Sequence, residues 1–582
     1  MAPPRRKPLD PSNAPKHIKK SKAPKYETFE EALDYGVELE EKGERYKTGE
    51  KAKRFYEEAC KLYEKAIEFD PQAFEGHYNL ARTLYTISQI FLLPPLSSNT
   101  LEMAINQYRL SQKLTESPIL WIDATFNLAV ALLSLADLVE DLQEADEQDA
   151  EVESLRREAA GWLTSVAEKQ EGLLEEMERQ NASVGEQESI LDIGEEPEED
   201  IDKHDHSPDQ DEVQAENGSG RAWEETVTTP SLVLDTYILL LSTLSLLSKD
   251  FSASRPSPSA LPEIPPIFQK FRVLDSLCAR SGAPRTLDIL VAEASAKLSV
   301  IRSAFEDGRP GWMEECRMVI ATLKSSWESI KDIDAPGSST HNTPRIDQET
   351  RISVVCTLGD AYALLAQLQR LSALQILLQT QTAPMIEQVQ EIWTTLSLST
   401  QCSSTALSIL TPSQQAFPST MPNRGESSSV LLALASLSLQ RAVLADEPWR
   451  NASAIKNKAQ LITNSITYSR RAAESSGTGW QTALAPWPSV MGWQSRPSWV
   501  DGGWEAEQTA REAILSNIRS QFYKAAPEAL QEVEKTLLRV KNRLQPTDVR
   551  RFVKELIEDH GILRGGSGGE EEQFWENVIN VL

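Results

Sequence analysis

The chain has 582 residues and a formal net charge of −28, with 40 % hydrophobic and 25 % charged residues. This length and balance allow substantial hydrophobic cores and are ordinary for a soluble helical protein. Five cysteines without a close pair exclude a disulfide framework and a zinc ribbon and favour a reducing compartment: Cys60, Cys278, Cys316, Cys356 and Cys402.

The first segment, residues 1–26, is a basic tail. Its first 25 residues hold eight Lys/Arg and one Asp, and large apolar residues are almost absent. We therefore expect it to be disordered. Such a cluster is typical of a nuclear-import signal or a nucleic-acid contact, and equally of a solubilising tail. Nucleic-acid binding is expected nowhere else, because the body of the chain is acidic.

Residues 27–180 have helical periodicity. The pattern predicts helices over Phe29–Tyr46 and about Lys53–Phe69, then a second pair from Phe74, interrupted by Pro94-Pro95 and resumed after the SerSerAsn at 97–99. A third pair is expected after Pro118, with its second helix delayed to about Ser154–Arg179. Prolines after each pair force the chain to turn.

Small and large residues recur on these helices. Ala59, Tyr63 and Ala66 share one helix face, and Pro71 ends that helix. The next helices carry a leucine, a small residue and a large apolar residue in the same order, as Leu80-Ala81-Leu84 and Leu128-Ala129-Leu132. This pattern resembles the tetratricopeptide repeat, whose antiparallel helix pairs stack into a solenoid. The resemblance implies an all-α, repeat-type fold that binds partners; a generic helical bundle with alanine-rich contacts is the alternative.

The resemblance also implies which side chains line the inner wall. With Gly43, Ala81 and Ala129 at the small eighth position, the wall positions are Val37, Glu40, Glu44, Glu75, Tyr78, Arg82, Asp123, Phe126 and Val130. The basic clamp that one subclass of the family uses for acidic tails is absent. We therefore expect a basic client, held by Glu40, Glu44, Glu75, Tyr78, Asp123 and Phe126. The alternative is that the carboxylates are solvated helix faces.

An acidic insertion follows at residues 181–229. From Glu140 to Glu216 there are 28 Asp/Glu against five Lys/Arg. This segment has too little apolar surface to fold, so we expect disorder. A flexible polyanion would concentrate a cationic client near the wall. Its densest tract is Glu195, Glu196, Glu198, Glu199, Asp200 and Asp202. A solubilising linker stays an alternative. The layout resembles that of chaperones for histones and ribosomal proteins.

The remaining chain is expected to hold divergent helical repeats at 230–478, a Trp/Pro/Gly-rich loop at 479–510 and C-terminal helices at 511–582. Leu358, Gly359 and Tyr362 repeat the leucine–small–large order, and Val430–Leu444 is predicted to be a buried helix. The apolar run Leu232–Leu247, at about 16 residues, is shorter than the roughly 20 that cross a bilayer, and we interpret it as a buried helix. The tryptophans are expected to pack on the last helices, with a peptide-binding platform as the alternative.

No catalytic motif is recognisable: there is no phosphate-binding GxxxxGK[ST] after a strand, no HExxH and no GxSxG nucleophile elbow. The GlyGlySerGlyGly at 565–569 has the GxSxG spacing, but we interpret it as a flexible joint before a last short helix. His204 and His206 are the one possible metal-binding pair, but we interpret them as polar residues of the charged, disordered stretch that bind no metal. We expect neither enzyme activity nor a cofactor, metal or membrane. The sequence favours an adaptor or chaperone for a basic protein, in the nucleus and/or cytoplasm. A structural scaffold subunit of a larger nuclear or cytoplasmic complex is the alternative.

Overall fold

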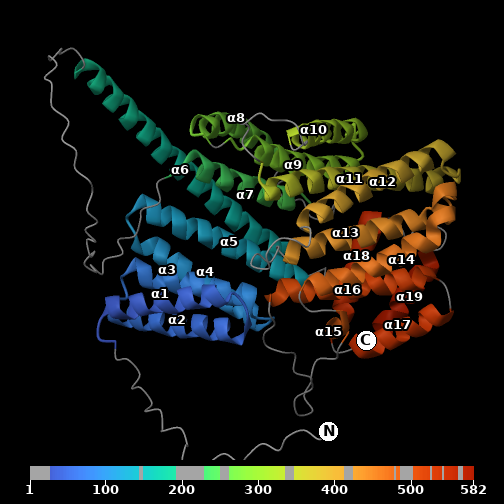
Figure 1. The fold of residues 1–582 in the computed structure, drawn as a ribbon, viewed down its shortest axis with the longest axis horizontal. Helices are drawn as coiled ribbons and strands as arrows, with labels where there is room; N and C mark the ends of the chain where they lie inside the picture. The colour runs from blue at the N-terminus through green and yellow to red at the C-terminus, as the bar shows by residue number, and fades with distance from the viewer. Residues whose placement is uncertain are drawn as a thin grey trace, which may run out of the picture.

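The structure is a computed structural model, which describes residues 26–142, 149–191, 228–249, 261–282, 284–333, 346–411, 424–476, 480–484, 502–524, 527–540, 543–560 and 568–582. Within these ranges every regular element is a helix, which confirms the all-α prediction. The basic tail and most of the acidic insertion lie outside the described residues. Figure 1 shows the helices stacked as a continuous layer that curves back on itself.

Six helices form three N-terminal pairs, and each pair packs on the next. The first helix has the predicted bounds, while α2 starts one turn earlier than expected, directly after Thr48. α4 likewise begins directly after Pro95, because a proline is tolerated just before a first turn. The helices are α1 (Phe29–Tyr46), α2 (Gly49–Phe69), α3 (Phe74–Ile90), α4 (Leu96–Leu114), α5 (Pro118–Leu142) and α6 (Asp149–Leu191).

Glycines let α1 and α2 approach closely. A Cβ on Gly36 would lie 2.6 Å from the ring of Tyr63, and one on Gly43 would lie 2.8 Å from the ring of Tyr56. Both tyrosine rings are buried, so the small position serves the packing that the repeat pattern predicts. Tyr46, which follows Gly43 at the large position of the repeat pattern, is 48 % exposed rather than buried, and its ring stacks on Phe55 of α2.

Side-chain contacts join corresponding helices of the second and third pairs. Tyr85 hydrogen-bonds Ser134 between α3 and α5, and Arg109 pairs with Glu158 between α4 and α6. The equivalent small residues of the two pairs, Ala81 and Ala129, are 48 residues apart. This unit is longer than the roughly 34 residues of a standard repeat, because its helices and its inner loop are longer.

The helix α6 is longer than the sequence pattern predicted. It begins at Asp149 and continues to Leu191, past Asn181, where we expected the periodic pattern to end. Its N-terminal part packs on α5 and α7, and Leu174 is its last buried residue among those whose side chains are described. The remaining turns extend away from the other helices, toward the upper left of Figure 1.

The central part of the chain continues the stack. Gly359 of α11 faces α12, where an added Cβ would meet Cys402 at 3.2 Å, so this glycine again permits close helix approach. Val430 and Leu434 are buried in α13, which confirms the helix predicted there. The helices are α7 (Pro230–Lys249), α8 (Ile264–Arg280), α9 (Thr286–Glu306), α10 (Trp312–Ile333), α11 (Gln348–Thr380), α12 (Ile386–Leu410), α13 (Arg424–Val443) and α14 (Ala452–Ser475).

Among the described residues, three helices are apolar and long enough, by length and composition alone, to cross a membrane: α5, α7 and α11. Between 50 % and 67 % of each apolar window is buried inside the protein. In α7, Leu240, Leu241 and Leu244 pack in the core between neighbouring helices, as predicted for this run.

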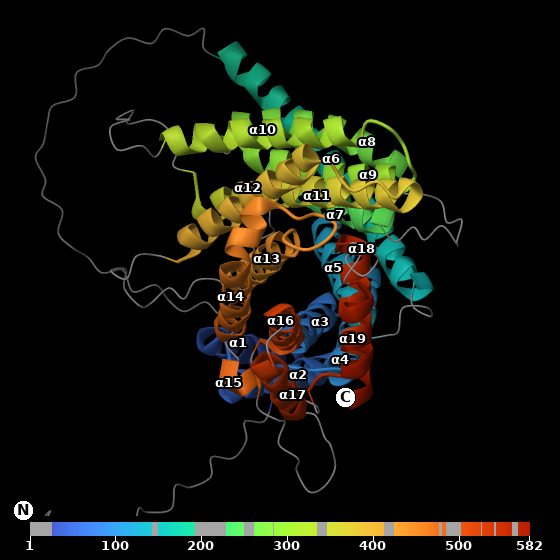
Figure 2. The ribbon, with the colours of Figure 1, turned by 90° about the vertical axis from the view of Figure 1, so that its right-hand side faces the viewer.

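The C-terminal helices form a compact block held by buried charges. They are α15 (Trp480–Ala483), α16 (Gly503–Lys524), α17 (Pro527–Val540), α18 (Pro546–His560) and α19 (Gly568–Val581). α16 packs on α13 and α14 and also reaches back to α3, as Figure 2 shows. Three buried ion pairs join α16 to the segments that follow it: Arg511–Asp548 at 3.0 Å, Arg543–Glu507 at 2.6 Å and Arg519–Glu571 at 2.8 Å.

Candidate partner-binding face

The first helices of the three N-terminal pairs, α1, α3 and α5, lie side by side and form one surface, here called the A-helix face. Side-chain contacts between consecutive helices fix their register. Arg82 of α3 reaches Glu40 of α1, and Asn127 of α5 donates a hydrogen bond to Tyr78 of α3 at 3.0 Å. The wall positions deduced from the repeat pattern therefore come together at the junctions between these helices.

Glu40 belongs to the packing of this face. Its side chain is buried, accepts a hydrogen bond from the Tyr63 hydroxyl at 2.8 Å, and pairs with the Arg82 guanidinium at 3.0 Å. Burial and the Glu40 charge raise the pKa of Tyr63 above its ordinary value, so this hydroxyl stays protonated and keeps donating. Glu40 thus joins α1, α2 and α3, and its charge is already balanced.

The other predicted carboxylates are more accessible. Glu44 is exposed near the end of α1, while Glu75 and Asp123 are half-buried near the starts of α3 and α5. None of these three has a cationic partner among the described residues. Burial raises the pKa of the Asp123 carboxyl, because desolvation disfavours its charged form. A cationic side chain placed there would relieve that cost.

Two aromatic residues lie beside these carboxylates. Tyr78 stacks on Phe74 with 5.2 Å between ring centroids, and burial together with the Asp123 charge raises the pKa of Tyr78 to about 12. Phe126 of α5 is half-buried and packs against the same core. The arrangement offers a cationic segment carboxylates for its charges and ring surfaces for its aliphatic stems.

The single cation at the nine wall positions is Arg82. Because Glu40 neutralises it, the face keeps the negative charge of Glu44, Glu75 and Asp123. The acidic tract from Glu195 to Asp202 lies outside the described residues, and so do His204 and His206. In the described part of the chain no group of three or more His, Cys, Asp and Glu side chains could hold a metal ion.

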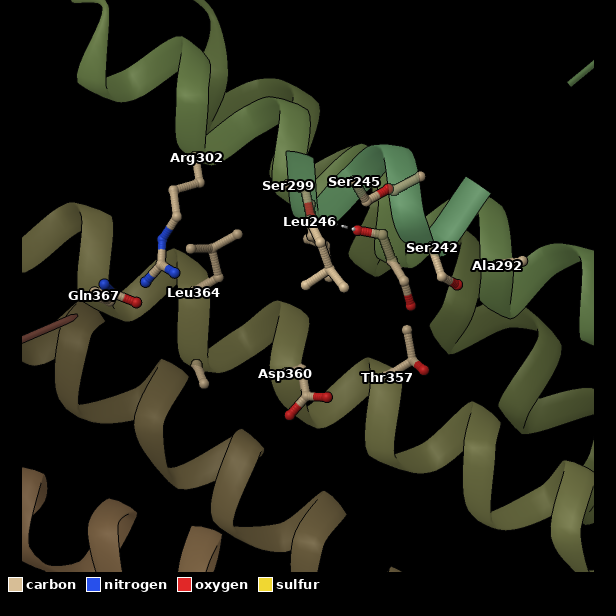
Figure 3. Close-up of a pocket in the computed structure, with 14 residues that line it drawn as sticks. Ser242, Ser245, Leu246, Ala292, Ser299, Arg302, Thr357, Asp360, Leu364 and Gln367 are labelled. Carbon is tan, nitrogen blue, oxygen red and sulfur yellow. Dashed lines mark hydrogen bonds between the residues drawn. The ribbon is translucent and has the colours of Figure 1, made fainter. Parts of the chain in front are cut away.

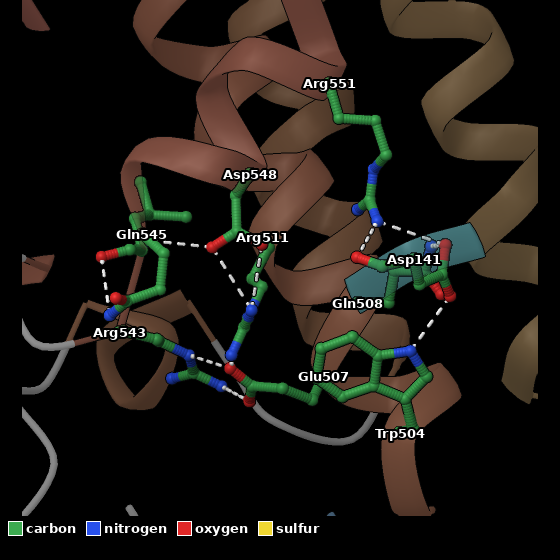
Figure 4. Close-up of polar contacts among 10 residues, drawn as sticks. Asp141, Trp504, Glu507, Gln508, Arg511, Arg543, Gln545, Asp548 and Arg551 are labelled. Atoms are coloured by element: carbon green, nitrogen blue, oxygen red, sulfur yellow. Dashed lines mark hydrogen bonds and ion pairs between the residues drawn. The ribbon is translucent and has the colours of Figure 1, made fainter. Parts of the chain in front are cut away.

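The C-terminal block meets the A-helix face at a contact that sequence reasoning missed. Asp141, near the end of α5, accepts hydrogen bonds from the Trp504 indole at 2.9 Å and the Gln508 amide at 2.7 Å. Arg551 of α18 pairs with the same carboxylate at 3.1 Å and donates to its backbone carbonyl at 2.6 Å (Figure 4). Burial raises the pKa of Asp141. We call this contact the seam.

Apolar packing accompanies the polar contacts of the seam. Trp504 packs with Leu93 and Leu138, and Gly503 lies so close to α3 that an added Cβ would come within 2.0 Å of the Gln89 carbonyl oxygen. Trp480 is buried in the C-terminal core, as expected for a tryptophan that packs on the last helices. Trp504 differs from that expectation, because it packs on the N-terminal repeats, and Trp487, Trp493 and Trp499 lie outside the described residues. The local signal that could have indicated the seam is the tryptophan after two glycines, Gly502-Gly503, both with positive φ.

A cavity lies on another part of the stack, between α7, α9 and α11. It has a volume of about 480 Å³, and small side chains such as Ser242 and Ser299 line it. Figure 3 shows Arg302 extending from α9 toward Gln367 of α11, with Asp360 on the same helix as Gln367. The lining offers surface for a partner but no nucleophile with an adjacent base.

The chain matches a family model described as TPR repeat at residues 55–87, from the middle of α2 to the end of α3. The UPF0656 protein C926.02 of Schizosaccharomyces pombe is 32 % identical over 131 residues, which are 22 % of this chain. The match spans only 28 % of that relative's length.

Two solved structures share the all-helical character at low similarity. The S. pombe nuclear import adaptor Nro1 is 11 % identical with a TM-score of 0.27, over 77 % of this chain and 95 % of that one. Yeast Tom70 is 11 % identical with a TM-score of 0.13, over 94 % and 96 %. Both scores are below 0.5, so neither structure bears on the function. The repeat match falls on α2 and α3, which pack on each other. Residues 55–87 are therefore similar to one TPR repeat within an all-helical chain.

Proposed function

We propose that the protein is a non-catalytic adaptor or chaperone that binds a basic segment of a protein client, such as a ribosomal protein or a histone, on the A-helix face. The observation that carries the proposal is the charge of this face. At the nine wall positions the one cation, Arg82, is neutralised by Glu40, while Glu44, Glu75 and Asp123 have no cationic partner among the described residues. A cationic segment is the partner whose charge complements that surface.

The acidic tract supports the same client class. Residues 195–202 hold six carboxylates, and α6 connects them to the third helix pair. A polyanion tethered to the chain raises the local concentration of a cationic client and weakens its electrostatic attraction to other polyanions. We propose that the tract captures the client and that the A-helix face then holds it.

A binding titration tests this proposal. The probe is a fluorescently labelled Lys/Arg-rich peptide, added to the full chain at rising salt. Glu75→Gln with Asp123→Asn should weaken binding about tenfold, since two partly exposed charge pairs are worth about 1–2 kcal/mol together. The matched control, Glu64→Gln with Glu102→Gln, removes two exposed carboxylates of the second helices α2 and α4 and should leave affinity unchanged. If both double variants lose the same affinity for the peptide, net charge alone explains the binding, and the proposal for this face is wrong.

Deleting residues 192–227 separates the two parts of the proposal. The deletion should slow association and flatten its salt dependence, because steering by the tract is lost. The Glu75 and Asp123 variants should still weaken binding in the shortened chain. A client that binds the shortened chain with unchanged rate and affinity would remove the tract from the mechanism.

A scaffold role is the second candidate, and one observation favours it. The corner between α11 and α12 exposes four large apolar side chains: Ile376, Leu378, Met385 and Ile386, the last 85 % exposed. Contiguous exposed apolar surface is typical of permanent interfaces. A complex that resists high salt, survives deletion of 192–227 and is lost in Leu378→Ser with Ile386→Ser would support this role instead.

We place the protein in the nucleus and/or cytoplasm, on the basis of its basic tail and its proposed clients. Deleting residues 1–26 from a fluorescently tagged chain tests the tail as an import signal. Loss of nuclear signal would support it, and an unchanged distribution would leave the tail as a solubilising segment.

A further inference from the structure

The helix α16 is firmly attached to the C-terminal block. The Arg511 guanidinium pairs with Asp548 of α18 at 3.0 Å, and both groups are buried. On another side, Ser520 hydrogen-bonds Ser465 of α14 at 2.8 Å inside the core. The helix therefore moves with the block that contains α13, α14 and α18.

The attachment of α16 to the N-terminal repeats is much smaller. It includes the seam, in which Trp504 and Gln508 donate hydrogen bonds to the Asp141 carboxylate and Trp504 fills the space beside Leu93 and Leu138. Arg551 of α18 adds contacts to the carboxylate and the backbone carbonyl of Asp141. The two sides of the seam are 363 to 410 residues apart in the chain. Between them the chain runs through the helical stack, so this contact joins the two ends of the stack.

The seam covers one end of the A-helix face. Gln89 and Asp141 lie near the C-terminal ends of α3 and α5, whereas Glu75 and Asp123 lie near their N-terminal ends. Because α3 and α5 run side by side in the same direction, α16 lies across the first end and leaves the second end open. A cavity of about 240 Å³ remains beneath it, lined by Ser88, Ser134 and Asp137 among others.

We propose that the seam is an autoinhibitory latch: α16 with Trp504 covers the C-terminal half of the A-helix face, and breaking the contacts of Asp141 opens the closed stack and uncovers that half. Trp504 is a suitable latch residue, because its ring also lies under the Arg511 guanidinium, 4.8 Å from the ring centroid. The indole thus links the seam to the buried charges of the C-terminal block. The autoinhibitory role rests on the proposed function, whereas the opening of the seam is a property of the free protein.

Amide hydrogen exchange and small-angle scattering on the full chain test the latch. In Asp141→Ala the three donors lose their common acceptor. We expect at least tenfold faster exchange at residues 85–93 and 503–510, a larger radius of gyration and an unchanged far-ultraviolet spectrum. The matched control is Asp34→Ala, which removes an exposed carboxylate of α1 and should change none of these.

A second variant distinguishes opening of the seam from local unfolding at the end of α5. Trp504→Ala removes the apolar part of the seam from the opposite side and should give the same local exchange pattern and the same expansion. The proposal is overturned if neither variant expands the particle, or if the exchange of every helix rises together with that of the seam. A Lys/Arg-rich peptide added to the opened variants should bind faster than to the parent chain. Unchanged peptide binding in an expanded variant would count against the autoinhibitory role alone.

Discussion

Replacing Glu40 by alanine should loosen the junction of α1, α2 and α3. The Tyr63 hydroxyl would stay buried without its acceptor, which costs about 1–3 kcal/mol. The loss of the ion pair adds about 0–1 kcal/mol, since the Arg82 side chain is 43 % exposed and can turn to water. We expect a total of about 2–3 kcal/mol. Glu40→Gln keeps an acceptor for Tyr63, so we expect about 1 kcal/mol or less.

Amide hydrogen exchange is the suitable assay, because a chain of this size does not unfold in one two-state step. An opening that is easier by about 2–3 kcal/mol speeds exchange in α1–α3 roughly 30- to 150-fold, and about 1 kcal/mol speeds it roughly fivefold. Helices of the C-terminal block, far from the junction, serve as the internal control and should keep their exchange rates.

A double-mutant cycle with Tyr63→Phe isolates the hydrogen bond. Removing both partners leaves no buried hydroxyl unsatisfied, so the double variant should be less destabilised than the sum of the single ones, by about 1 kcal/mol. The reasoning is refuted if Glu40→Ala exchanges like the parent chain, or if Glu40→Gln is as harmful as Glu40→Ala. If Glu40→Ala lost peptide binding without any loss of local stability, Glu40 would instead be a client-binding residue, as first predicted.

Three further predictions concern packing, pH and buried charge. Gly36→Ala places a methyl group against the Tyr63 ring and should destabilise the first repeat by about 1–3 kcal/mol. Gly161→Ala has open space around its Cβ and should be neutral or slightly stabilising. Thermal melts that rank the two variants in the opposite order would contradict this. Peptide binding should weaken as the pH falls through the raised pKa of Asp123, because protonation removes the attracting charge. This loss should occur at a higher pH than for an ordinary aspartate. Asp123→Asn should not show this pH-dependent loss of binding. Glu507→Gln breaks a fully buried contact with two arginines and should destabilise the C-terminal block by about 3–5 kcal/mol, seen as faster proteolysis there; resistance equal to the parent chain would count against it.

Local patterns predicted the helices well where they repeat. The bounds 29–46 and the start at Phe74 follow from apolar spacing and from the proline after each pair. The end of α6 was missed, because residues 181–191 are polar and carry no face to bury, yet they continue a helix that is already nucleated. Periodicity identifies where a buried face lies and says less about where a polar helix stops.

The candidate site was predictable in position and only partly in chemistry. The repeat spacing places Glu40 and Arg82 on one face, but their pairing depends on the distance between successive helices, which the spacing does not give. For the seam, the two glycines before Trp504 mark an unusual turn but do not indicate its partner. One aspartate and one tryptophan 363 residues apart leave no periodic trace in the sequence.

The end of α6 extends beyond the packed helices. From Leu174, its last buried residue in the described part, to Leu191 the helix rises about 25 Å, at about 1.5 Å per residue. In the sequence the acidic tract begins four residues after this helix ends. In the proposed mechanism, attachment at that distance would let a client meet negative charge before it reaches the A-helix face.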